Sequence, residues 1–160
     1  MINTTDKPLI TAGVFLGIGL GGFVDGILFH QIFQIHSMLS SKLPPVTVAN
    51  LETNMVWDGL FHCITWTMTV MGIILLWKAA KNPIVPLVGK TIAGAAILGW
   101  GLFNLVEGVI DHHILHLHHV VERLGVSIFD YAFLLSGVLL SVGGVMMIKS
   151  ARNSSLPETR

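Results

Sequence analysis

The stretch Asn104–His119 reads NLVEGVIDHHILHLHH, and it joins a long apolar segment to a cluster of histidines. The apolar segment contains a single carboxylate, Glu107. The stretch then finishes with Asp111 and five histidines, namely His112, His113, His116, His118 and His119. An ionisable group inside an apolar segment of membrane length is costly and marks a functional site. Because histidine and carboxylate are ligands of transition metals, the cluster beside it predicts a metal site.

A similar pattern occurs earlier in the chain. Residues 17–36 read GIGLGGFVDGILFHQIFQIH, and residues 99–118 read GWGLFNLVEGVIDHHILHLH. When the two stretches are aligned without a gap, eight of the twenty positions are identical. The ionisable residues that coincide in this repeat alignment are Asp25 with Glu107, His30 with His112, and His36 with His118. We interpret the match as an internal duplication.

The composition predicts a membrane protein. Only 11% of the 160 residues are charged, against about 25% in soluble proteins, and 52% are hydrophobic. A bilayer core about 30 Å thick requires about 20 apolar residues in a helix. Four segments meet this requirement within a single membrane domain. The predicted spans are residues 9–33, 55–77, 87–110 and 128–148, with polar tails at 1–8 and 149–160.

The second and fourth spans also align with each other, more weakly, in a register that pairs Asp58 with Asp130. We therefore predict an all-α, integral membrane four-helix bundle. It would be built from two duplicated two-helix units in parallel orientation, related by an axis along the membrane normal. On α-helical geometry, Glu107, Asp111 and His118 share one face of the third span, and His112 belongs to a second line of residues.

The basic residues predict the orientation of the chain. Seven of the nine lie at the end of the helices that carries both termini, and only Lys42 and Arg123 lie at the other end. Since basic loops stay inside, we expect both termini in the cytoplasm. The acids and histidines then gather at the extracytoplasmic end. The equal numbers of acidic and basic residues give no indication of a nucleic-acid partner.

The candidate ligands come from all four predicted helices, as in metal sites in the cores of helical bundles. They outnumber the ligands of one ion, so we expect a polynuclear site. Zinc or copper is favoured and iron is a further candidate. The single cysteine, Cys63, excludes an intrachain disulfide and argues against an iron–sulfur cluster. The candidate metal ligands are Asp25, His30, His36, Asp58, His62, Glu107, His112, His113, His118 and Asp130.

Several residues also have a structural interpretation. Buried acids can hold helices together through hydrogen bonds, and Asp58 and Asp130 lie near helix starts, where a carboxylate is a favoured cap. His62 shares a helical face with Asp58, yet a hydrogen-bonded core histidine would occur there as well. His116 and His119 could be solvated residues at the membrane interface.

Three functional alternatives stay open. The bound metals could make the protein an oxygen-reactive oxidoreductase or a hydrolase, with Asp58 or Glu107 as a candidate general base. His36 and His118 could instead ligate a haem. A proton or ion pathway is the third alternative, although the cytoplasmic half of the helices contains no chain of ionisable residues.

The motifs GFVDGILFHQ, NMVWDGLFH and NLVEGVIDHH resemble those of a bacterial family of small four-span membrane proteins catalogued as a domain of unknown function. The resemblance covers nearly the whole chain. It implies a four-helix fold in the bacterial inner (plasma) membrane. It adds Asn54 and His119 to the candidate site and omits His116. Besides the lipid bilayer, the expected partners are a second copy of the chain and a metal-delivery or respiratory membrane protein.

Overall fold

The computed structural model describes residues 4–153, and these residues form helices and loops without strands. Four helices are long and apolar enough to cross a membrane, which confirms the all-α fold with four candidate spans. Shorter π-helical segments continue two of them, and a 3₁₀ turn precedes the last. The elements are α1 (Lys7–Asp25), η1 (Gly26–Ile32), α2 (Val48–Ala80), α3 (Gly89–Glu107), η2 (Gly108–Ile114), η3 (Glu122–Leu124) and α4 (Ile128–Asn153).

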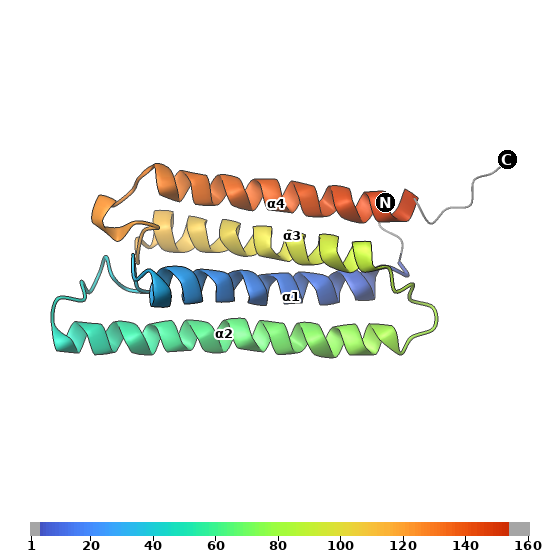
Figure 1. Cartoon of the computed structure of the whole chain (residues 1–160), viewed down its shortest axis with the longest axis horizontal. Helices are drawn as coiled ribbons and strands as arrows, with labels where there is room; N and C mark the ends of the chain where they lie inside the picture. The colour runs from blue at the N-terminus through green and yellow to red at the C-terminus, as the bar shows by residue number, and fades with distance from the viewer. Residues whose placement is uncertain (1–3, 154–160) are drawn as a thin grey trace.

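The four helices lie side by side in the order α2, α1, α3, α4, and consecutive helices alternate in direction (Figure 1). The inner helices α1 and α3 pack on each other, whereas α2 packs on α1 and α4 packs on α3. Glycines allow the inner pair to approach. A Cβ added at Gly17 would collide with the carbonyl of Ala96, and one at Gly99 would collide with the carbonyl of Val14. Small residues at such contacts are typical of helices packed in lipid.

The second helix is longer than its hydropathy predicts. It begins at Val48 rather than near residue 55 and ends at Ala80. Thr47 caps its first turn, because the Thr47 hydroxyl accepts a hydrogen bond of 3.2 Å from the backbone N–H of Asn50. The polar residues that follow Thr47 therefore belong to the helix and not to the predicted connector. At the other end of the chain, α4 extends to Asn153 within the predicted tail, and residues 154–160 lie outside the described residues.

Both inner helices change to π-helix in their last turns, at Gly26–Ile32 and Gly108–Ile114. Each π-helix is followed by a residue with positive φ, Gln34 at 50° and His116 at 48°. In a π-helix the hydrogen bond joins residues five apart, so side chains at positions i and i+5 lie near each other. This geometry corrects the α-helical prediction for the third span, because it places His112 beside Glu107.

Candidate metal centre

In the α1 half of the cluster, His30 lies between two carboxylates. Its Nε2 is 3.2 Å from Oδ2 of Asp25, five residues earlier on the same helix. Its Nδ1 is 2.8 Å from Oδ1 of Asp58 on α2. All three side chains are buried. In metal sites, a ligating histidine commonly donates one ring N–H to a carboxylate and binds the ion through its other nitrogen. Asp58 is in the position of that carboxylate, which leaves Nε2 of His30, beside Asp25, as the candidate ligand atom.

The α3 half repeats this arrangement with Glu107, His112 and Asp130. Nε2 of His112 is 3.0 Å from Oε1 of Glu107, and its Nδ1 is 3.3 Å from Oδ1 of Asp130 on α4. These three residues are also buried. Each outer helix therefore contributes one carboxylate to a histidine of the inner helix on which it packs.

Two further histidines lie in the loops that follow the inner helices, and each of them is hydrogen-bonded to a carbonyl of the other loop. His36 donates from Nδ1 to the carbonyl of Val120 over 3.0 Å, and His118 donates from Nδ1 to the carbonyl of Met38 over 3.2 Å. Backbone N–H groups of the same two acceptor residues bind the outer carboxylates. Met38 donates to Asp58 over 2.8 Å, and Val120 donates to Asp130 over 3.1 Å.

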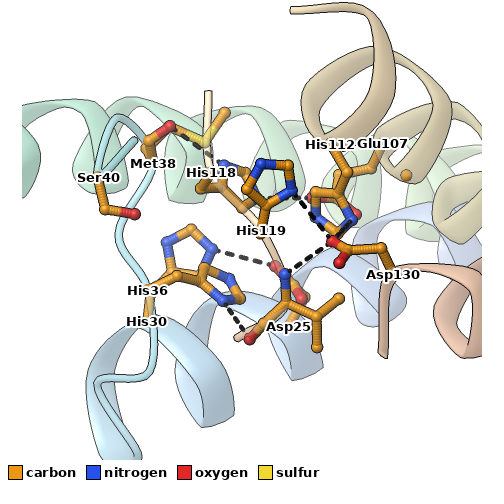
Figure 2. A network of polar contacts seen from close by, with 12 residues as sticks. Asp25, His30, His36, Met38, Ser40, Glu107, His112, His118, His119 and Asp130 are labelled. Carbon is orange, nitrogen blue, oxygen red and sulfur yellow. Dashed lines mark hydrogen bonds and ion pairs between the residues drawn. The ribbon is translucent and has the colours of Figure 1, made fainter. Parts of the chain in front are cut away.

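The four histidine rings meet between the two inner helices (Figure 2). Ring centroids are 4.4 Å apart for His30 and His36, 4.7 Å for His36 and His118, and 4.9 Å for His112 and His118. In every one of the four, Nδ1 faces a carbonyl or an outer carboxylate. For His30, His36 and His118 this contact is a hydrogen bond, which favours the tautomer with hydrogen on Nδ1 and leaves the lone pair of Nε2 for the centre of the cluster.

Several buried side-chain atoms of the cluster lack a hydrogen-bond partner among the described residues. They are Asp25 Oδ2, His30 Nε2, His36 Nε2, Glu107 Oε2, both ring nitrogens of His112, and Nδ1 of His119. Buried polar atoms normally have partners, so this group requires an explanation, and an ion that the atoms bind is one. Two ligand atoms with bonds of about 2.0–2.1 Å to one tetrahedral ion lie roughly 3.3 Å apart. The observed N···O distances of 3.0 and 3.2 Å are close to that separation.

Two groups of three residues have ligand atoms within 4.8 Å of one another. The first contains His30, His36 and His118, and the second contains Glu107, His112 and His118. All five of these residues are buried. His118 belongs to both groups, so it connects the two halves of the cluster.

His36 lies in the loop after η1, beyond the membrane span. Burial, together with the neighbouring His118 and His30, lowers its pKa to about 2. The ring is therefore neutral at neutral pH. Since a metal ligand must offer a free lone pair, this protonation state is the one that an ion requires.

Two predicted ligands, His62 and His113, do not join the cluster. Each ring donates from Nδ1 to a carbonyl of its own helix, over 2.7 Å to Asp58 for His62 and over 2.8 Å to Gly108 for His113. The ring of His62 contacts phenylalanines, and the ring of His113 contacts Tyr131. Neither residue belongs to a group of three ligands among the described residues.

Sequence reasoning missed part of the loop structure around the cluster. The carboxylate of Glu122 accepts hydrogen bonds of 2.7 Å from the hydroxyls of Ser40 and Ser41, and so joins the two loops. His119, which belongs to the histidine cluster of the sequence and is supported by the family resemblance, has Nδ1 3.3 Å from Asp130 Oδ1. Asn54, which only the family resemblance indicated, accepts a hydrogen bond from the N–H of Leu39. Ser40 and Glu122 coincide when the repeat alignment is extended into the loops, which is the signal that could have pointed to them.

Residues 12–151 match the model of a family described as "Predicted membrane protein (DUF2243)". The chain belongs to this family. The match confirms the expected resemblance and agrees with the four apolar helices. No curated protein and no solved structure matches the chain. The family description names no activity, so the residues of the cluster carry the argument about function.

Proposed function

We propose that this integral membrane protein binds two transition-metal ions in the His/carboxylate cluster, with zinc or copper favoured and iron a further candidate. The observation that carries the proposal is the common orientation of four buried histidines. Nδ1 of His30, His36 and His118 is hydrogen-bonded to a carboxylate or carbonyl, and Nδ1 of His112 lies 3.3 Å from Asp130. The Nε2 atoms of His30, His112 and His118 lie within 3.2 Å of a carboxylate oxygen of Asp25 or Glu107. Transition metals with imidazole and carboxylate ligands fit this donor set.

The buried charge supports two ions rather than one. Asp25, Asp58, Glu107 and Asp130 are all buried, and within residues 4–153 their only ion-pair partners are histidines. Four carboxylates with neutral histidines carry a charge of about −4, and buried charge requires compensation. Two divalent ions would balance it. Protonated histidines are the alternative source of positive charge, and the experiment below separates the two.

We also infer that the cluster arose from a repeated two-helix unit in parallel orientation. Features that recur at equivalent positions of the repeat alignment support this inference. The π-helices, the positive φ values and the exchange between His36 and His118 recur in this way. The proposed orientation has both termini in the cytoplasm of a bacterial cell and the cluster near the outer face of the inner membrane, as the basic residues predict.

The geometry gives less support to haem. The rings of His36 and His118 stack with centroids 4.7 Å apart and an angle of 17° between their planes. A haem held by two axial histidines would have to lie between these rings. Their direct contact leaves no space for it without a movement of both loops.

Elemental analysis of the purified protein by mass spectrometry tests the proposal. We expect about two transition-metal ions per chain in parent protein, and a loss of metal in His112→Ala. The matched control is His62→Ala, a helix histidine outside the cluster, which should keep the parent content. A folded, metal-free parent protein that takes up no zinc, copper or iron on titration would overturn the proposal in favour of protonated histidines.

A further inference from the structure

A lateral cavity lies beside the cluster, over α1 and between α2 and α3. It opens because the backbones of α2 and α3 do not come close to each other in the described part of the chain. Its volume is about 420 Å³, within the range of small-molecule sites. Val106 and Ile64 on its wall are 58% and 59% exposed, so the cavity opens sideways at the depth of the spans. The apolar lining residues are Ile18, Met38, Phe61, Ile64, Leu102, Phe103, Val106 and Ile110.

Two carboxylates, Glu107 and Asp111, also line the cavity, one helical turn apart. Glu107 is 6% exposed and uses Oε1 to contact His112 and His118. Its other oxygen, Oε2, is buried and has no hydrogen-bond partner among the described residues. A buried acceptor of this kind costs free energy until a donor reaches it. Because both lining acids can accept hydrogen bonds, an occupant of the cavity would gain by carrying a hydroxyl group at this end.

The walls near the acids are aromatic. The rings of Phe61 and Phe103 both line the cavity, with centroids 6.0 Å apart and an angle of 40° between their planes. Aromatic rings pack well against other flat rings in offset or tilted geometry. The cavity thus has long apolar walls, two aromatic rings near one end, and two carboxylates that can accept hydrogen bonds.

A second cavity, over α3 and between α1 and α4, occupies the equivalent position and is smaller, with a volume of about 250 Å³. In the repeat alignment, Trp100 in this cavity corresponds to Ile18, and Phe29 corresponds to Asp111. The larger side chain of Trp100 fills space, whereas Gly21 stands in place of Phe103 and leaves space, and the second acid is absent. The difference identifies the α2–α3 cavity as the one with room for a ligand.

We propose that the α2–α3 cavity binds a membrane-dissolved molecule of the quinol class. Its chain would lie along the apolar walls, its ring against Phe61 and Phe103, and its hydroxyl would donate to the carboxylate of Asp111 or Glu107. A phospholipid fits less well, because its acyl chains have no donor and its phosphate would be repelled by two carboxylates. This proposal is about binding of the quinol in the cavity, and it does not depend on whether the cluster binds metal.

The test uses full-length protein in nanodiscs of neutral phospholipid, titrated under anaerobic conditions with decylubiquinol and separately with decylubiquinone. Bound ligand is quantified after equilibrium dialysis against empty nanodiscs. We expect one decylubiquinol per chain and weaker binding of decylubiquinone, which lacks the donor. Ile18→Trp places in this cavity the residue that fills the equivalent one, and it should weaken decylubiquinol binding at least about tenfold, a change of about 1.4 kcal/mol.

The control is Leu139→Trp, because Leu139 is 63% exposed on α4 and does not line the cavity. It should bind decylubiquinol within about twofold of parent, a difference below about 0.5 kcal/mol. If Ile18→Trp does not fold, Val106→Trp blocks the same cavity from the lipid side. Equal binding by parent and the blocked variant, equal affinity for the quinone, or no binding would overturn the proposal. Metal content measured in the same samples tests the cluster separately.

Discussion

The two halves of the cluster have the same layout, but their central acids differ in length by one methylene group. In the α3 half, Oε1 of Glu107 reaches both His112 at 3.0 Å and His118 at 2.9 Å. In the α1 half, Asp25 reaches only His30, at 3.2 Å, and Nε2 of His36 has no hydrogen-bond partner among the described residues. The longer side chain of Glu107 thus lets one carboxylate contact two histidines, whereas the shorter Asp25 contacts one.

The outer carboxylates differ in the opposite sense. Asp58 makes a hydrogen bond of 2.8 Å with His30. Asp130 lies 3.3 Å from His112 and also 3.3 Å from His119, and it accepts from the backbone N–H and the hydroxyl of Ser127. The α1 half therefore has the tighter outer contact, and the α3 half has the tighter inner contact. The variants described below test whether these differences in contact distance affect metal binding.

The largest effect should come from the two loop histidines. Because His118 belongs to both groups of ligands, His118→Ala should lose both ions. His36 belongs to one group, so His36→Ala should keep about one ion, in the α3 half. Elemental analysis of the two variants after identical metal loading measures the difference. Equal metal contents in the two variants would contradict the assignment of His118 to both halves.

Exchange of the central acids should have the next largest effect. Glu107→Asp shortens the side chain that reaches two histidines, and we expect metal affinity to fall by about 100-fold, or about 2.7 kcal/mol. Asp25→Glu lengthens the other acid and should change affinity by less than about tenfold. Competition titration with a chromogenic chelator gives both values. A larger loss of metal affinity in Asp25→Glu than in Glu107→Asp would show that the α1 half contributes more to metal binding.

Removal of the outer carboxylates should weaken binding more moderately. Changes to residues that orient a metal-ligating histidine typically lower metal affinity by about 10- to 100-fold. We expect Asp58→Asn to lie at the upper end of this range, because its contact to His30 is short, and Asp130→Asn to lie at the lower end. The same chelator titration measures them. The reverse order would mean that contact length does not set the orientation of these histidines.

The smallest effect should follow from a position next to the site at which the outer helices differ, His62 on α2 and Leu134 on α4. Since a Cβ at Gly26 would meet His62, and one at Gly108 would meet Leu134, the two side chains fill equivalent places. His62→Leu should therefore leave metal content and affinity within about twofold of parent, below about 0.5 kcal/mol. A marked loss of metal would add His62 to the site.

The four spans could be predicted from hydropathy, because a helix in a bilayer must present apolar residues along most of its length. The pairing of Asp25 with Glu107 and of His30 with His112 was visible as a repeat in the sequence. The start of α2 at Val48 could not be predicted in this way, because a capped polar turn outside the apolar core has no hydropathy signal. Distances between Glu107, His112 and His118 depend on a π-helix, which α-helical periodicity does not predict.

The sequence by itself determined that this chain crosses a membrane and that its acids and histidines gather at one end of the helices. Only the tertiary structure decided which of them meet. It brought the loop histidines His36 and His118 into contact and left His62 and His113 on their own helices. The physical reason is that hydropathy depends on composition along one helix, whereas a shared site depends on the packing of α1 against α3 and on the exchange of hydrogen bonds between two loops.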